Sequence, residues 1–221
     1  MDKIFHKEVS IQVGQTNLGG ELYIPPGAKA IIVFSHGSGS SRFSTRNQQV
    51  AAYLRERNFG TLLLDLLTPE EDNLYQNRFN IELLTKRLKG ATEWLERVPA
   101  AKNCRIGYFG ASTGAASALQ AAAGLEQVGA VVSRGGRPDL ASLNALKAVK
   151  APVLCIVGSL DTEVLELNKQ ALEEMRCHKE LVVVEGATHL FEERGKLDEV
   201  AKLASAWFET YLKPVPIRNR Y

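Results

Sequence analysis

The sequence predicts an α/β fold, a mostly parallel sheet of about eight strands with helices on both faces and an antiparallel hairpin at its start. Apolar stretches alternate with segments of helical periodicity along most of the chain. Some of these stretches, such as 30–34 and 153–157, are apolar without interruption, as strands covered on both faces are. We predict a single domain over residues 1–213 and a loosely ordered, mildly basic tail over 214–221.

The opening strands are expected at 9–13 and 21–24, with the Gln-Thr-Asn-Leu-Gly-Gly segment between them as the turn of a hairpin. Six apolar strands follow, each with a segment of helical periodicity or helix length after it: Ala30–Ser35, Thr61–Asp65, Cys104–Phe109, Gly129–Ser133, Val153–Val157 and Leu181–Val184. Apolar residues three and four apart predict a long helix within 81–98 and a closing helix that ends near Leu212. The segments between these strands and the helices that follow them are short, so they leave no room for a lid domain.

Composition and charge exclude several classes of protein. The net charge of +2 is too small to indicate a nucleic-acid partner, and no apolar run is long enough to span a membrane. The first residues lack the apolar core of a secretory signal, so we expect a cytoplasmic protein. Three cysteines without paired spacing indicate neither a disulfide framework nor a metal site, and no cofactor motif is recognised. The sequence leaves open whether the protein is a monomer or a homodimer.

The most informative motif is Gly110-Ala-Ser112-Thr-Gly114, which lies where an apolar strand gives way to an alanine-rich helix. This is the pattern of a nucleophile elbow, in which a tight turn requires small flanking residues and exposes the central hydroxyl. The first amides of the following helix would face negative charge that develops near Ser112. The motif alone is common, but its position between strand and helix favours a catalytic serine.

A serine nucleophile needs a base, and His189 is the best candidate among the four histidines. It follows the last strand in Gly186-Ala-Thr-His189, whereas His6 and His178 are expected at the surface. His36 belongs to a glycine-rich loop, where shaping the loop is its expected role. The chain order of serine, acid and histidine favours His189 over an ordinary loop histidine.

Asp161 is the predicted acid, because it comes just past the end of the 153–157 strand and between Ser112 and His189 in the chain. Asp139 is the nearest competitor, but it is expected to cap a helix. Asp65 precedes Ser112 and is expected to brace loops.

The loop His36-Gly37-Ser38-Gly39 follows the strand at 30–35, and its glycines let backbone amides approach a substrate closely. Acyl transfer needs hydrogen-bond donors for the oxyanion, and we predict that the amides of Ser38 and Thr113 supply them. Gly37 and Gly39 are expected to line the substrate site. A glycine-serine run is also typical of a flexible turn, so this assignment depends on the elbow.

With these residues in place, the chain resembles an α/β-hydrolase, and more narrowly the small, lidless, dienelactone-hydrolase-like branch of that superfamily. The resemblance extends from the hairpin to about Leu212. It implies Ser112 as nucleophile, His189 as general base and then acid, Asp161 as the residue that orients His189, and an acyl-enzyme that water resolves. True dienelactone hydrolases have cysteine at the elbow, so the serine favours a small soluble ester or thioester over the dienelactone itself.

Several arginines are placed where they could face the cleft. Arg42 and Arg46 follow the oxyanion loop, and Arg134 and Arg137 follow the 129–133 strand. Arg134 could bind a carboxylate or phosphate of an anionic ester, with the two glycines after it forming an exposed turn. The alternative is an ion pair between Arg134 and Asp139 or another acid.

Two other functions stay open at this point. The fold could serve as a catalytically silent module that binds a ligand or a partner, although such a module need not keep nucleophile, acid and base together. The same three side chains could also serve a peptidase or an acyltransferase, and the fold does not decide the substrate.

Overall fold

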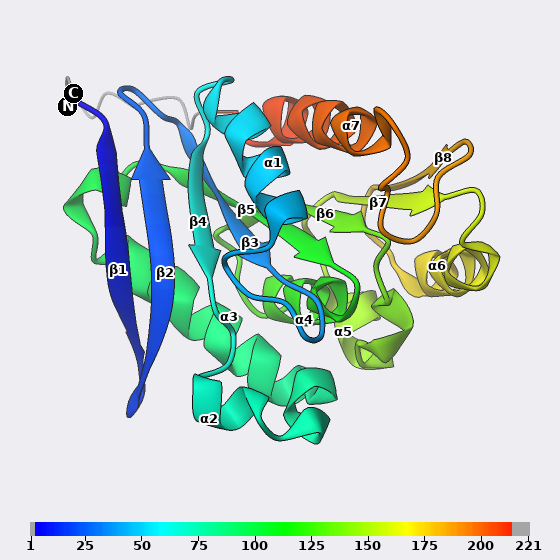
Figure 1. The fold of residues 1–221 in the computed structure, drawn as a ribbon, viewed down its shortest axis with the longest axis horizontal. Helices are drawn as coiled ribbons and strands as arrows, with labels where there is room; N and C mark the ends of the chain where they lie inside the picture. Colours follow the sequence, from blue (N-terminus) through cyan, green and yellow to red (C-terminus); the bar gives the residue numbers. More distant parts are fainter. Residues whose placement is uncertain (1–2, 214–221) are drawn as a thin grey trace.

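The computed structural model describes residues 3–213, and the predicted tail at 214–221 lies outside the described residues. Its strands form an eight-stranded sheet in the order β1-β2-β4-β3-β5-β6-β7-β8 (Figure 1). The strands are β1 (Phe5–Val13), β2 (Thr16–Ile24), β3 (Ala30–Ser35), β4 (Gly60–Leu64), β5 (Arg105–Ala111), β6 (Val128–Arg134), β7 (Val153–Gly158) and β8 (Lys179–Val184). The pairs β1-β2 and β2-β4 are antiparallel and the other neighbours are parallel, which confirms the predicted fold class.

The opening hairpin is longer than predicted. β1 and β2 pair from Phe5 opposite Ile24 to Val13 opposite Thr16, so Gly14 and Gln15 form the turn and the predicted turn segment was wrong. Gly14 has a φ of +62°, a conformation that two-residue hairpin turns require. In the sequence, the polar residues and glycines at 15–20 resemble a loop. In the structure, 16–20 belong to β2, and Leu18 is the side chain among them that points into the core.

Helices cover both faces of the sheet, as predicted. The helices are α1 (Thr45–Arg55), α2 (Pro69–Asp72), α3 (Ile81–Glu96), α4 (Thr113–Ala122), α5 (Leu143–Ala148), α6 (Thr162–Glu174) and α7 (Lys196–Tyr211), with 3₁₀ turns η1 (Tyr75–Phe79), η2 (Pro99–Ala101) and η3 (Pro138–Leu140). α1 and α7 pack together on one face, and α3 packs against α4 on the other (Figure 1). The sheet therefore separates two apolar cores, one around Phe109 and Phe208 and the other around Tyr108 and Leu119.

The parallel strands bring the predicted site residues to one edge of the sheet. β3, β5, β6 and β7 are neighbours and run in the same direction, so their carboxyl ends lie side by side. The segments that follow these ends begin with His36, Ser112, Gly135 and, after a short turn, Asp161. Ligands of open α/β sheets bind beyond this edge.

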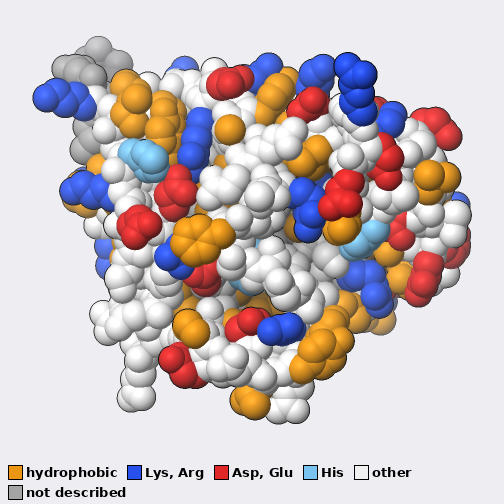
Figure 2. All heavy atoms as spheres, in the orientation of Figure 1, with side chains coloured by type: hydrophobic (Ala, Val, Ile, Leu, Met, Phe, Trp, Pro, Cys, Tyr) orange, Lys and Arg blue, Asp and Glu red, His pale blue; other side chains and the backbone are white. Residues whose placement is uncertain are grey.

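Within residues 3–213, no helix is both long enough and apolar enough to cross a membrane. On the face drawn in Figure 2, acidic and basic side chains are interspersed, without a large patch of one sign.

Candidate active site

Ser112 lies in a tight turn between β5 and α4, with φ 50° and ψ −123°. A Cβ on Gly110 would lie 2.5 Å from Cα of Ala115, and one on Gly114 would lie 2.1 Å from the carbonyl oxygen of Ser35. Neither glycine can therefore carry a side chain unless the backbone moves. The positive φ of Ser112 is a strained conformation for a residue with a side chain, and it is the backbone geometry of a nucleophile elbow.

The imidazole of His189 and the carboxylate of Asp161 lie in direct contact. The distance between Nδ1 of His189 and Oδ2 of Asp161 is 2.6 Å. The side chain of Asp161 is 14% exposed and that of His189 is 36% exposed, so the imidazole is open to solvent and the carboxylate is shielded. A carboxylate at Nδ1 favours the tautomer that carries its proton there, which leaves the lone pair of Nε2 free to accept a proton.

The end of β6 connects this pair to Ser112. The backbone N–H of Ser112 donates to the carbonyl of Arg134, 3.2 Å away. The next residue, Gly135, has a φ of +49°, and a Cβ there would lie 3.5 Å from both Nδ1 and Cε1 of the His189 ring. The imidazole of His189 thus lies against Gly135, and the residue before it, Arg134, binds the backbone of Ser112. Within residues 3–213 the Ser112 hydroxyl forms no hydrogen bond of its own.

The loop that carries His189 is anchored by Phe191. This residue has a φ of 58°, although its ring is large and only 1% exposed. Glu193 closes the loop by accepting the N–H of Thr188 at 3.2 Å. The buried ring compensates for the strained backbone, so His189 is held by packing as well as by Asp161. No sequence signal marks this anchor, because a positive φ is typical of Gly and Asn.

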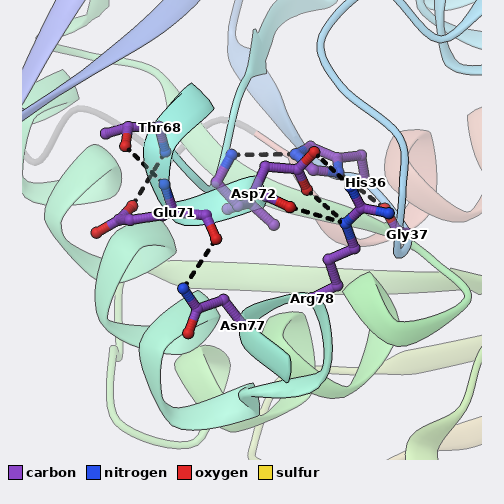
Figure 3. Close-up of polar contacts among 8 residues, drawn as sticks. His36, Gly37, Thr68, Glu71, Asp72, Asn77 and Arg78 are labelled. Carbon is purple, nitrogen blue, oxygen red and sulfur yellow. Dashed lines mark hydrogen bonds and ion pairs between the residues drawn. The ribbon is translucent and has the colours of Figure 1, made fainter. Parts of the chain in front are cut away.

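On the other side of Ser112, His36 holds the predicted oxyanion loop (Figure 3). Its Nε2 accepts the backbone N–H of Leu66 at 3.0 Å, and its Nδ1 lies 2.9 Å from the carbonyl of Gly37. Both contacts require the neutral ring with its proton on Nδ1. Burial lowers the pKa of His36 below its usual value of 6.5, which keeps the ring neutral. His36 therefore shapes the loop, the role expected from its position in the sequence.

The oxyanion loop itself lies against the elbow. A Cβ on Gly37 would be 3.1 Å from Cβ of Ser112, so the loop and Ser112 are in contact. Ser38 is exposed, and the next residues turn back where the N–H of Ser40 donates to the Gly37 carbonyl at 3.2 Å. Thr113 is the first residue of α4, where an amide has no acceptor within its own helix. Both predicted donors thus come from segments that border Ser112.

A segment that the sequence analysis did not single out supports this loop. Between β4 and α3, Arg78 pairs with Asp72 through two bonds of 2.9 Å, and its guanidinium lies 3.7 Å from where a Cβ on Gly39 would be (Figure 3). Thr68 and Glu71 cap α2 reciprocally. The Thr-Pro-Glu-Glu sequence of this capping box is a recognisable helix start, and it could have located the segment.

The arginines near the cleft have different surroundings. Arg42 pairs with Asp65, as expected of a loop-bracing aspartate, and Arg46 lies 2.8 Å from Glu192. Both arginines therefore already have a carboxylate partner. Arg134 is 4% exposed, and its side chain forms no hydrogen bond or ion pair within residues 3–213.

Three expectations for the segment after β6 were wrong. Asp139 pairs with Arg137 through bonds of 2.9 and 2.8 Å, so it is not the partner of Arg134, and α5 is capped by Ser142 rather than by Asp139. The two glycines after Arg134 were expected to form an exposed turn, but both are buried. A Cβ on Gly136 would overlap the hydroxyl of Ser133, so this turn packs onto the sheet.

Within the described residues 3–213, the acidic, histidine and cysteine side chains form no cluster of three or more that could hold a metal ion.

Comparison with known proteins gives a family match over most of the chain. The sequence model of the Dienelactone hydrolase family matches residues 18–213. The crystal structure of a dienelactone hydrolase from Anabaena variabilis is 52% identical, with a TM-score of 0.91 over 95% of this chain and 99% of that chain. The esterase Pf2001 of Pyrococcus furiosus is 19% identical with a TM-score of 0.78, over 95% of this chain and 94% of that chain, which is a likeness of fold alone.

Among curated proteins, a Mycobacterium tuberculosis protein named "Putative phosphoribosyl transferase" is 52% identical over 207 residues, which are 93% of this chain but 46% of that protein. The chain thus spans about half the length of this relative. A Bradyrhizobium protein named "Probable 2-oxo-3-(5-oxofuran-2-ylidene)propanoate lactonase" is 26% identical over 76% of this chain and 77% of that protein.

Proposed function

Because the chain belongs to the dienelactone hydrolase family of the α/β-hydrolase superfamily, we propose that it is a serine hydrolase that cleaves a small soluble ester or thioester. Ser112 is the nucleophile, His189 the general base and then acid, and Asp161 the residue that orients the imidazole. The amides of Ser38 and Thr113 form the oxyanion hole. The reaction needs no metal or organic cofactor in this mechanism.

In the first half of the reaction, Oγ of Ser112 attacks the ester carbonyl carbon while its proton passes to Nε2 of His189. Negative charge moves to the carbonyl oxygen, where the two amides stabilise it. The tetrahedral intermediate collapses, the bond to the leaving alcohol breaks, and the imidazolium gives its proton to that alcohol. Water then repeats the sequence on the acyl-enzyme, with His189 again taking and returning one proton.

The proposal rests on the contact of 2.6 Å between His189 and Asp161, on the positive φ of Ser112, and on the end of β6, which touches both Ser112 and His189. The carboxylate at Nδ1 gives the imidazole the tautomer that a general base needs, and the elbow gives the hydroxyl the exposure that a nucleophile needs. The contact between Oγ of Ser112 and Nε2 of His189 is part of the proposal, since such contacts often tighten only when substrate binds.

Two names among the relatives bear on the substrate. A lactone is a cyclic ester, so the activity in the name of the Bradyrhizobium relative is carbonyl chemistry of the kind proposed here. The transferase name belongs to a protein of which this chain matches less than half. We do not carry that activity to this chain, because the matched segment is the one that the hydrolase family covers.

The test combines labelling with turnover. The wild-type chain should react with a fluorophosphonate probe and should hydrolyse 4-nitrophenyl esters, with short neutral acyl groups tried first. Ser112→Ala should abolish the labelling and reduce kcat by about 10⁴-fold or more. Ser10→Ala, which changes an exposed serine of β1, is the matched control and should label as the wild type does.

Three results would separate the alternatives. Ligand binding without labelling would indicate a silent module. Turnover of peptides rather than esters would indicate a peptidase, and transfer of the acyl group to an added amine or alcohol in preference to water would indicate an acyltransferase. Labelling that persists in Ser112→Ala would overturn the assignment of the nucleophile.

A further inference from the structure

Arg134, the last residue of β6, is a buried cation without a partner among residues 3–213. It is 4% exposed, and its Nε is sealed from solvent without a hydrogen-bond acceptor. Arg87 is buried to a similar extent, at 6% exposed, and its Nε also lacks an acceptor, but its guanidinium is paired with the carboxylate of Glu71. A buried charge without a counter-ion costs free energy, so its presence calls for an explanation.

The surroundings of Arg134 add positive charge rather than negative. Burial and the nearby charge of Arg46 lower the pKa of Arg134 to about 10. The guanidinium lies 5.9 Å from the centre of the Phe191 ring, which contributes a weak cation–π contact. Arg46 is already paired with Glu192. The described residues therefore leave one positive charge at Arg134 uncompensated.

The place of Arg134 connects it to the proposed active site. Its own carbonyl accepts the N–H of Ser112, and the next residue touches the ring of His189. Ser133 faces the core on the α4 side, so alternation along β6 directs the side chain of Arg134 to the opposite face, between α1 and the Phe191 loop. Arg46 and Phe191 also line a groove of about 270 Å³ on that face.

We propose that Arg134 binds a singly charged oxyanion group of the substrate, a carboxylate in the simplest case, and so makes the enzyme selective for anionic esters. This inference rests on the proposed function and specifies its substrate class. The planar guanidinium can hold both oxygens of a carboxylate at once. One uncompensated charge fits a monoanion, and the ligand supplies the counter-ion that the described residues lack.

The same arrangement predicts a link between ligand binding and stability. An anion that binds at Arg134 removes the cost of the isolated charge, so it should raise the Tm. Replacing Arg134 by a residue of similar length without charge should also raise the Tm of the free protein. A site that reduces stability until its ligand arrives is the usual sign of a functional rather than a structural residue.

The kinetic experiment compares two esters with acyl chains of equal length, 4-nitrophenyl hydrogen glutarate and 4-nitrophenyl pentanoate. The wild type should prefer the charged ester, and Arg134→Met should reduce the ratio of the two kcat/KM values about 10- to 100-fold. Arg134→Lys keeps the charge without the fork and should give an intermediate ratio. Arg87→Met is the matched control, because it removes a buried arginine of α3 that is already paired with Glu71, and it should leave the ratio unchanged.

A second measurement does not depend on turnover. In Ser112→Ala, monomethyl glutarate should raise the Tm and dimethyl glutarate should not, and the shift should vanish when Arg134→Met is added. Inorganic phosphate at matched ionic strength distinguishes a site for any anion from a carboxylate site. Free Arg134→Met should melt about 2–8 °C above the wild type.

An unchanged ratio in Arg134→Met, or in Arg134→Lys if the first variant does not fold, would overturn the proposal. A lower Tm for free Arg134→Met would overturn its premise of an uncompensated charge. Absence of turnover with both esters would instead contradict the proposed function, and the thermal shift would still test the anion site.

Discussion

The two flanks of Ser112 differ in how their polar side chains are satisfied. On the β3 side, both nitrogens of His36 have partners, and the Asp72–Arg78 pair is joined by two bonds. On the β6 side, Nε of Arg134 and the hydroxyl of Ser133 are buried without hydrogen-bond partners among residues 3–213. Both flanks border Ser112, the proposed nucleophile.

This difference separates two tasks of an active site. A flank that must present backbone amides at fixed positions benefits from a complete hydrogen-bond network, because each bond restrains the loop. A flank that must recognise a ligand needs polar groups without partners inside the protein, because only such groups are free to bind the ligand. Breaking each flank separately tests this interpretation.

The largest expected effect comes from Asp161→Asn, which should disrupt the orientation of His189, the proposed base. The amide can donate to Nδ1 and would favour the wrong tautomer of His189, so kcat for a 4-nitrophenyl ester should fall by about 10⁴-fold. Asp139→Asn is the control for the competing acid and should cost far less activity. A greater loss of activity in Asp139→Asn than in Asp161→Asn would show that Asp161 is not the acid.

The next effect tests how closely the β3 flank fits the elbow. Gly114→Ala would place a Cβ 2.1 Å from the Ser35 carbonyl oxygen and 2.5 Å from that of His36, so the free energy of unfolding should fall by about 3 kcal/mol. Urea denaturation measures this change. Gly195→Ala, at a positive φ but with no atom within 4 Å of the new Cβ, should be milder. Equal losses would contradict the expectation that the close contacts at residue 114 cost more than a positive φ at an open position.

His36→Gln should weaken the satisfied flank by about 2 kcal/mol, because it disturbs the acceptor of the Leu66 N–H. It should also change the pH dependence. The pKa of His36 is lowered in the folded state, so below pH 6.5 the unfolded chain binds a proton that the folded chain does not. Stability should therefore fall as the pH drops below 6.5, and this contribution should vanish in His36→Gln. Urea titrations at pH 7.5 and 5.5 would measure the difference between the two chains.

The smallest effect concerns the paired counterpart of Arg134. Arg87→Met leaves Glu71 without its partner, and because that carboxylate is 25% exposed the loss of stability should be about 1 kcal/mol. The sign is opposite to that expected for Arg134→Met. Thermal melts of the two variants side by side would show whether pairing alone distinguishes the two buried arginines.

The sequence predicted those features that depend on local pattern. The elbow could be recognised because sterics restrict residues 110 and 114 to glycine, and the strands because uninterrupted apolar runs need cover on both faces. Asp161 and His189 could be placed because the carboxyl ends of parallel strands share one edge. The parallel neighbours β7 and β8 end side by side and bring these two residues together, although 28 positions separate them.

The features that the sequence did not predict depend on packing between distant segments. Arg134 and Arg137 are three residues apart, and only the buried turn between them decides which one reaches Asp139. The burial of Gly135 follows from the His189 loop, which comes more than fifty residues later. The hairpin turn was misplaced because polar residues of an edge strand resemble a loop.

The buried ring of Phe191 has a consequence for engineering this enzyme. Because the ring and Glu193 fix the path of the loop, the exposed positions Thr188 and Glu192 tolerate different degrees of change. Glu192 can be randomised in a library without loosening the position of the His189 ring, whereas Thr188 donates the hydrogen bond to Glu193 that closes the loop. Directed evolution of substrate range should therefore diversify the outer surface of this loop and leave its aromatic anchor untouched.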